Sequence, residues 1–271
     1  MHAAITICLV PEARQGPFVF HDGLAAACQA AADLGFDAVE VFPESAAAVP
    51  TADLERLLAQ HRLRLAAVGT GAGWVKHKLH LCHPDAAHRS RACDFIAAII
   101  ELAGRFGAPA IIGSMQGRSD GEVDRDAALD HLAAALHDLG ARAARQGQVL
   151  LYEPLNRYET NLFNRQATAA EFLRSRGVAH VKLLCDLFHM SMEEADIAAA
   201  LMACGDLVGH VHWADSNRRA VGFGHTDPRP IVAALHAIGY QGYLSAEVFP
   251  LPTPLDAARQ SITSIRRHVP V

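Results

Sequence analysis

Eight short apolar segments, each followed by a stretch that suits a helix, repeat along this chain of 271 residues. The segments are typical of β-strands because they combine apolar runs with Gly, Pro, Asp or Asn at their ends. Their mean spacing is about 34 residues, which is the length of one strand-helix unit in a parallel barrel. The segments lie at residues 4–9, 36–42, 63–69, 109–113, 148–153, 180–186, 207–213 and 242–248.

The connecting stretches are rich in Ala and Leu, which favour helices. Clear examples are residues 23–34, 52–61 and 86–106. Asp22 is a candidate N-cap for the first of these helices, and Gly35 is placed to end it. Eight alternations of strand and helix predict an α/β fold, a (β/α)8 TIM barrel, as a single domain over residues 1–271. No Gly-x-Gly-x-x-Gly opens a helix after the first strand, which argues against an open nucleotide-binding sheet.

Charge and composition exclude several function classes. The formal net charge is -5, and no cluster of Lys and Arg is present to neutralise a phosphate backbone, so we expect no nucleic-acid partner. No apolar run approaches the roughly 18 to 20 residues that cross a bilayer, so we expect no membrane partner. The six cysteines show no Cys-x-x-Cys spacing, which indicates a reducing, cytoplasmic compartment.

Each of the last four predicted strands ends in a side chain that can bind a metal ion: Glu153, Asp186, His212 and Glu247. Barrel enzymes carry their functional groups at these strand ends, and alternation along a strand lets all four side chains face the barrel mouth. Three carboxylates without a counter-charge would repel one another, so the pattern predicts one divalent cation between them. This oxygen-rich set suits Mn²⁺, Mg²⁺ or Co²⁺, and suits Zn²⁺ less because no thiolate is placed to help.

Four protein ligands leave room on a six-coordinate ion for a carbonyl and a neighbouring hydroxyl. Such chelation polarises the carbonyl and acidifies the C–H bond beside it, which is the chemistry of sugar isomerisation and epimerisation. His210 faces the same way as His212 but one layer deeper in the barrel. We therefore expect His210 to be a hydrogen-bonded core histidine rather than a ligand.

Five stretches of the C-terminal half carry a family resemblance. They are Glu153–Glu159, Cys185–Glu194, His210–Arg218, Gly224–Asp227 and Ser245–Phe249. As an ordered set they resemble the ketose 3-epimerase group of the xylose-isomerase-like TIM-barrel superfamily, which includes D-tagatose and D-allulose 3-epimerases. The resemblance implies the same four metal ligands that the strand ends indicate, and we take Mn²⁺ as the first choice of ion. It also implies a small keto-sugar as substrate and a homo-oligomer, either a dimer or a tetramer.

The resemblance further implies an epimerase that inverts C3 of a ketose or keto-sugar acid. Glu153 and Glu247 would lie on opposite faces of the substrate, one removing the C3 proton to form a cis-enediolate and the other returning a proton. His189 and Arg218 match residues that hydrogen-bond the C2 oxygen. Glu159 matches a residue that supports the catalytic glutamate or a substrate hydroxyl.

Phe249 matches an apolar substrate contact of the same family. A hydroxypyruvate or keto-inositol isomerase is the main alternative, because it would use a similar glutamate pair and return the proton to another carbon. Arg218 and the loop of Glu159 favour the epimerase. A remote alternative is a DNA repair enzyme like endonuclease IV, which shares the fold but needs further histidines for three zinc ions. The third strand and its following residues, 67–73, contain no histidine.

Overall fold

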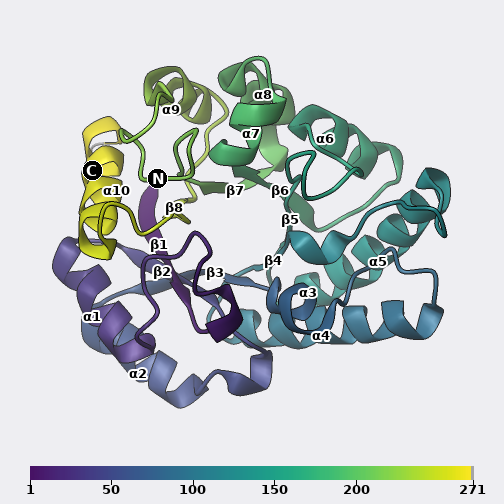
Figure 1. The fold of residues 1–271 in the computed structure, drawn as a ribbon, viewed down its shortest axis with the longest axis horizontal. Coiled ribbons are helices and arrows are strands. Elements are labelled where there is room, and N and C mark those ends of the chain that lie inside the picture. The colour runs from purple at the N-terminus through teal and green to yellow at the C-terminus, as the bar shows by residue number, and fades with distance from the viewer. Residues whose placement is uncertain (270–271) are drawn as a thin grey trace.

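The computed structural model describes residues 1–269 and confirms the predicted barrel. Eight parallel strands pair in chain order, and the first also pairs with the last, so the sheet closes on itself (Figure 1). All eight strands overlap the predicted segments. They are β1 (His2–Cys8), β2 (Ala38–Phe42), β3 (Arg64–Gly69), β4 (Ala110–Ile112), β5 (Leu150–Tyr152), β6 (Val181–Asp186), β7 (Val208–His212) and β8 (Tyr243–Ala246).

Helices follow the strands and form a ring around the barrel (Figure 1). They are α1 (Leu24–Leu34), α2 (Thr51–His61), α3 (Ala72–His77), α4 (Ala86–Arg105), α5 (Arg125–Arg145), α6 (Gln166–Ser175), α7 (Leu187–Glu193), α8 (Ile197–Cys204), α9 (Pro228–Ala237) and α10 (Pro254–His268). Short 3-10 turns are η1 (Pro11–Ala13), η2 (Ala46–Ala48), η3 (Ser114–Gln116) and η4 (Gly205–Leu207). Within residues 1–269, no helix is both long and apolar enough to cross a membrane.

The two ends of α1 show one wrong prediction and one confirmed prediction. Asp22 does not cap the helix, because the N-cap is Gly23, which makes no side-chain hydrogen bond. Gly23 has a φ of 85°, a conformation that glycine adopts without steric cost. At the other end, Gly35 takes the left-handed conformation and ends the helix as predicted.

The apolar core has an outer and an inner part. Outward-facing strand residues such as Ile5, Val39 and Leu150 join one large cluster with the surrounding helices. A separate cluster inside the barrel contains Ala67, Ile111, Leu151 and Leu184. Leu151 and Leu184 precede Glu153 and Asp186 by two positions, so this inner apolar cluster lies beneath the ends of β5 and β6.

Strand register sets the strand ends at one level. Asp186 of β6 is paired with His212 of β7, and His212 is paired with Ser245 of β8. Glu153 is the residue after Tyr152, the last residue of β5. Glu247 is two residues after Ser245 of β8. The carboxyl edge of the barrel therefore presents all four predicted ligands at the same mouth.

Candidate metal centre and active site

His212 is the centre of the predicted ligand set. Its Nδ1 lies 3.6 Å from Glu153 Oε1, 3.4 Å from Asp186 Oδ2 and 3.6 Å from Glu247 Oε2. Atoms that bind one ion at about 2.1 Å lie about 3.0–3.4 Å from one another, so small side-chain shifts would complete such a shell. All four predicted residues therefore lie around His212 Nδ1, at the ends of β5, β6, β7 and β8. The ligand atoms of Glu153, Asp186 and His212 form one mutually close group, whereas Glu247 Oε2 also accepts a hydrogen bond from Arg218.

Three atoms of this group are buried and lack any hydrogen-bond partner within the described part of the chain. They are Glu153 Oε1, Asp186 Oδ2 and His212 Nδ1. Leaving buried polar atoms unpaired is costly, and native proteins avoid it unless a ligand or ion satisfies them. The unpaired atoms are two carboxylate oxygens and an imidazole nitrogen, which is a donor set that fits a divalent cation.

The two carboxylate oxygens of Asp186 have different roles, one in capping a helix and one in the candidate metal site. Oδ1 accepts hydrogen bonds from the backbone N–H groups of Phe188 at 2.7 Å and His189 at 3.3 Å, and so caps α7. Oδ2 is left to face His212. Burial acts to raise the pKa of Asp186, but His189, His212 and Arg218 outweigh it and hold the pKa below its usual value. Asp186 is therefore ionised at neutral pH.

Glu40 on β2 orients His212 from behind. The Nε2 atoms of His212 and His210 donate to the two oxygens of this fully buried carboxylate at 3.2 Å and 2.9 Å, and Thr6 also donates to it at 3.1 Å. With its proton on Nε2, His212 keeps the Nδ1 lone pair free for an ion. His210 is a hydrogen-bonded core histidine, as predicted.

The remaining carboxylates show the electrostatic conflict expected from the sequence. Burial raises the pKa of Glu153 well above its usual value, and the nearby carboxylates of Asp186 and Glu247 raise it further. Burial also raises the pKa of Glu247. Burial alone would lower the pKa of His212, but Glu40 and Glu247 outweigh it and raise that pKa well above normal. A positive charge is therefore favoured at this point of the mouth.

His189 is buried beside the centre, as a residue of α7. Its Nδ1 accepts hydrogen bonds from the side-chain amide of Asn156 at 2.8 Å and from the Asn156 backbone N–H at 3.3 Å. Because Nδ1 accepts, the proton of neutral His189 is on Nε2, which lies 3.9 Å from Glu153 and 3.8 Å from Asp186. His189 therefore presents an N–H donor at the carboxylates. The same Asn156 amide donates to Glu159 at 2.9 Å, which is half-exposed at the cavity rim.

Arg218 reaches the centre from the loop after β7. Its guanidinium donates to Glu247 at 2.6 Å and lies 4.8 Å above the ring of Phe188. The buried carboxylate of Asp215 fixes this loop by accepting four backbone N–H bonds within residues 216–226. Phe249 donates its backbone N–H to the Arg218 carbonyl at 2.8 Å. The side chain of Phe249 is not among the described residues that line the mouth cavity, so its substrate contact stays a prediction.

The mouth cavity is lined by both predicted glutamates, His189, His212, Arg218 and Glu159. Phe42 adds an apolar wall. Gly113, directly after β4, makes room for Glu153, because a Cβ at this position would lie 2.5 Å from Glu153 Oε2. The arrangement combines paired carboxylates, N–H donors and one centre for a cation in a single pocket.

Sequence reasoning missed three residues that support the site. Glu40 could have been found, because a carboxylate within an otherwise apolar strand needs a buried partner. Gln116 locks the end of β5 by donating to the Glu153 carbonyl at 2.9 Å, while its own oxygen accepts from Tyr152. No sequence pattern predicts the contacts of Gln116 or of Asn156, because these contacts depend on the conformation of loops.

Comparison with known proteins decides the family. The family model described as xylose isomerase-like TIM barrel matches residues 28–268. The chain belongs to this family. The resemblance predicted from the C-terminal stretches is confirmed, and curated members that match the chain are named as sugar epimerases.

Three similar proteins illustrate this relationship. A 3-dehydro-D-guloside 4-epimerase of Escherichia coli is 38% identical over 125 residues, which are 46% of this chain and 48% of that protein. A D-psicose 3-epimerase of Agrobacterium fabrum is 28% identical over 242 residues, covering 88% of this chain and 80% of the relative. The solved D-allulose 3-epimerase of Methylomonas sp. has a TM-score of 0.82 at 24% identity, covering 99% and 98% of the two chains. That structure supports the fold alone.

The curated relatives with the highest identity align over only part of their length. The chain spans about half of each of them or less.

Proposed function

We propose that residues 1–271 form one barrel domain that epimerises a ketose or keto-sugar acid at C3, next to its carbonyl. Glu153, Asp186, His212 and Glu247 would hold one divalent cation, with Mn²⁺ as the preferred ion. The observation that carries the proposal is the convergence of Glu153 and Glu247, each 3.6 Å from His212 Nδ1. Their strands, β5 and β8, are three positions apart around the closed barrel, so the two carboxylates approach from different sides. A cation bound here would polarise the sugar carbonyl and acidify the adjacent C–H bond.

The two glutamates are the proton-transfer groups of this proposal. One glutamate, as the carboxylate, removes the C3 proton, which leaves a cis-enediolate, and the other, as the carboxylic acid, gives its proton to the opposite face, which inverts C3. The substrate must bind between them for this to occur, and both side chains line the same cavity. Which glutamate acts as the base depends on the configuration of the substrate.

His189 and Arg218 stabilise the negative charge that develops on the substrate. The Nε2–H of His189 and the guanidinium of Arg218 are donors on the cavity wall, where they can reach the oxygen at C2. Glu159 is placed to bind a hydroxyl, since Asn156 holds it at the rim. Because these donors act on developing charge, alanine at either position should lower kcat more than it raises KM.

A deuterium experiment tests the reaction class. The Mn²⁺-loaded protein is incubated in D₂O with a panel of ketohexoses, keto-sugar acids, 3-keto-glycosides and hydroxypyruvate. Deuterium at C3 of an inverted product supports the proposal. Label only at C1 selects the aldose-ketose isomerase instead. Label at C4 of a 3-keto-glycoside, the position named for the Escherichia coli relative, would overturn the C3 assignment but keep the glutamate pair.

Substitution of the glutamates tests the residues. Glu153→Gln and Glu247→Gln should each abolish turnover while leaving the far-ultraviolet circular dichroism spectrum unchanged. Glu171→Gln on the exposed face of α6 is the matched control and should retain full activity. Near-wild-type turnover in either mouth variant would show that the two-glutamate scheme is wrong.

The remaining parts of the proposal concern the working state of the protein. We propose a cytoplasmic homo-oligomer, a dimer or tetramer, with a small keto-sugar as its only partner and without nucleic acid or membrane. Light scattering after size-exclusion chromatography measures the oligomeric state directly.

A further inference from the structure

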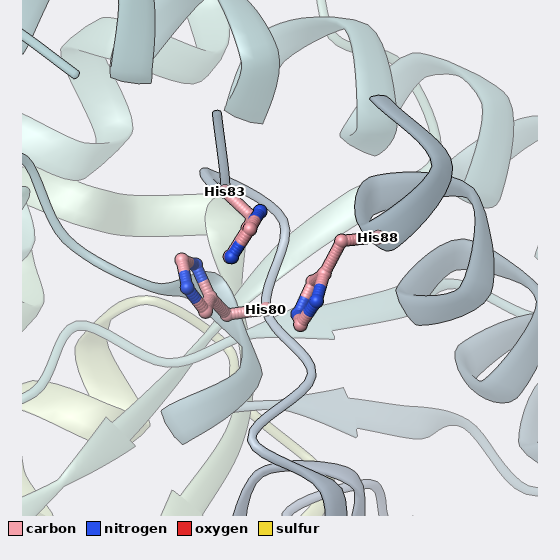
Figure 2. A group of neighbouring side chains, drawn as sticks. All are labelled: His80, His83 and His88. Atoms are coloured by element: carbon pink, nitrogen blue, oxygen red, sulfur yellow. The ribbon is translucent and has the colours of Figure 1, made fainter. Parts of the chain in front are cut away.

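Three histidines gather outside the barrel mouth, in the segment that joins α3 to α4. His80 and His83 are on the connecting loop, and His88 is on the first turn of α4 (Figure 2). One ring nitrogen of each lies within 4.8 Å of the others, and the three rings surround one space. The rings of His83 and His88 are stacked with centroids 3.8 Å apart, and His80 lies 5.2 Å and 5.5 Å from them. None of the three belongs to the mouth centre.

His80 has one ring nitrogen without a hydrogen-bond partner within residues 1–269, and His88 has one that only the exposed Arg91 contacts. The Nε2 of His88 lies 3.2 Å from the Lys78 carbonyl, which only an N–H can satisfy, so the lone pair of His88 is on Nδ1. This Nδ1 accepts a hydrogen bond from the Arg91 guanidinium at 3.4 Å, which a bound ion would displace. A backbone carbonyl behind the ring is the usual second partner of a metal-bound histidine. The Nδ1 of His80 is buried and has no hydrogen-bond partner within residues 1–269. His80 thus has a polar atom that nothing in the described chain satisfies.

His83 is the adaptable member of the group. Its Nδ1 accepts the backbone N–H of Asp85 at 3.0 Å, and this bond is exposed. Water can replace His83 as the acceptor when the ring turns toward an ion, since Asp85 is on the surface. The site therefore needs rotation of the His83 ring and movement of the exposed Arg91 side chain away from His88 Nδ1, and no change in the barrel.

Protons compete weakly with a metal ion at His80 and His88. Burial lowers the pKa of His80 to about 4, and the two neighbouring histidines contribute to the shift. Burial and His83 also lower the pKa of His88. Burial therefore disfavours the protonated form of His80 and His88 and favours the neutral ring that a metal ion needs.

We propose that His80, His83 and His88 form a second metal site, for a divalent transition-metal ion of the zinc class. Three imidazole nitrogens without a carboxylate in the group favour Zn²⁺, Co²⁺, Ni²⁺ or Cu²⁺ over Mg²⁺ and Mn²⁺. Three protein ligands leave the fourth position of a tetrahedral ion open to water. The chain would thus have two metal sites with different preferences, an oxygen-rich site in the mouth and a site with only nitrogen ligands on the loop.

The second site is connected to the entrance of the mouth. His80 lines a side cavity of about 350 Å³, together with Trp74, Tyr158 and Glu159. Glu159 and Ser114 line both this cavity and the mouth cavity. An ion on the three histidines would fix the loop to α4, and so fix the wall of the side cavity that His80 forms.

Zinc binding by the full chain tests the proposal. The probe is Zn²⁺ alone at a buffered free concentration, and bound zinc is counted by mass spectrometry after equilibrium dialysis. The double variant His83→Ala/His88→Ala should bind one zinc ion per chain fewer than wild type. His77→Ala is the matched control, because His77 is exposed on α3 and lies outside the cluster, and it should bind as much zinc as wild type. Equal zinc in the double variant and wild type would overturn the proposal.

Hydrogen exchange supplies a readout that is independent of the ion bound in the mouth. Zn²⁺ should slow amide exchange across residues 78–88 in wild type and in His77→Ala, but not in the double variant. If the double variant does not fold, His83→Ala alone is used, since its side chain is only half-buried in a loop. Zinc that leaves exchange of residues 78–88 unchanged in wild type would also overturn the proposal. Both results are independent of whether the mouth epimerises a sugar.

Discussion

Replacing Glu40 with glutamine should weaken metal binding in the mouth, although Glu40 is not one of the four predicted ligands. Its carboxylate accepts N–H bonds from His212 at 3.2 Å and His210 at 2.9 Å. A glutamine has nearly the same shape but only one acceptor oxygen, and its amide nitrogen is a donor. In Glu40→Gln, one of the two histidines must therefore either face a donor with its own N–H or move its proton to the other ring nitrogen.

The magnitude follows from what His212 then loses. If the His212 proton moves to Nδ1, the lone pair that faces Glu153 and Asp186 is gone. If the proton stays on Nε2, His212 loses a hydrogen bond to a charged acceptor, which contributes about 1.5–3 kcal/mol. Removing a partner of this kind from a ligating histidine typically lowers metal affinity about 10–100-fold, or about 1.4–2.8 kcal/mol. The two estimates agree.

Isothermal titration with Mn²⁺ measures this loss directly, and turnover at saturating Mn²⁺ separates weak binding from damaged chemistry. Thr6→Val is the matched control, because it removes the 3.1 Å hydroxyl bond to Glu40 but keeps the carboxylate and both histidine bonds. Thr6→Val should therefore change Mn²⁺ affinity much less than Glu40→Gln does. A folded Glu40→Gln protein with wild-type Mn²⁺ affinity would refute the role assigned to Glu40.

Three further predictions concern the mouth and the barrel edge. Gly113→Ala should lower kcat with little loss of stability, because the new Cβ would lie 2.5 Å from Glu153 Oε2 and push this carboxylate aside. Steady-state kinetics measures kcat, and thermal unfolding measures stability. Chelator treatment should lower the Tm, and Mn²⁺ at 100 times its Kd should raise the free energy of unfolding by about 2.7 kcal/mol and so restore the Tm; a Tm independent of Mn²⁺ would contradict the metal centre. Arg266 and the Ala3 N–H hold the pKa of Asp37 below its usual value despite burial, so the ionised carboxylate stabilises the fold above about pH 4 and this contribution is lost as pH falls further. The stability difference between wild type and Arg266→Gln in urea should therefore be full at pH 7 and shrink at pH 3.

The barrel and its four strand-end ligands could be predicted because both follow from short-range rules. Strand segments are visible as apolar runs, and alternation within each strand fixes which side chains share the inner face. Parallel pairing in chain order then brings the ends of β5 to β8 to the same edge without any information about loops. Asp186 and His212 are even paired residues in the register.

The supporting residues could not be predicted, because their roles depend on contacts between distant parts of the chain. Glu40 is 172 positions from His212, and only barrel closure places β2 behind β7. Asn156 acts on His189 through a loop whose path no periodic pattern describes. Asp22 failed as a helix cap for a local reason, because the adjacent Gly23 takes the N-cap position with a φ of 85°.

Charge matching inside the mouth gives the strongest physical reason for a cation at His212. Glu247 is matched by Arg218 at 2.6 Å, and Glu40 is matched by the two N–H groups of His210 and His212. Glu153 and Asp186 both remain directed at His212 Nδ1, where a single proton could offset only one of the two carboxylates. A divalent ion at the same atom offsets both, and it can do so only if it displaces that proton. The carboxylates that raise the pKa of His212 are therefore also the groups that make a doubly charged ion the better occupant.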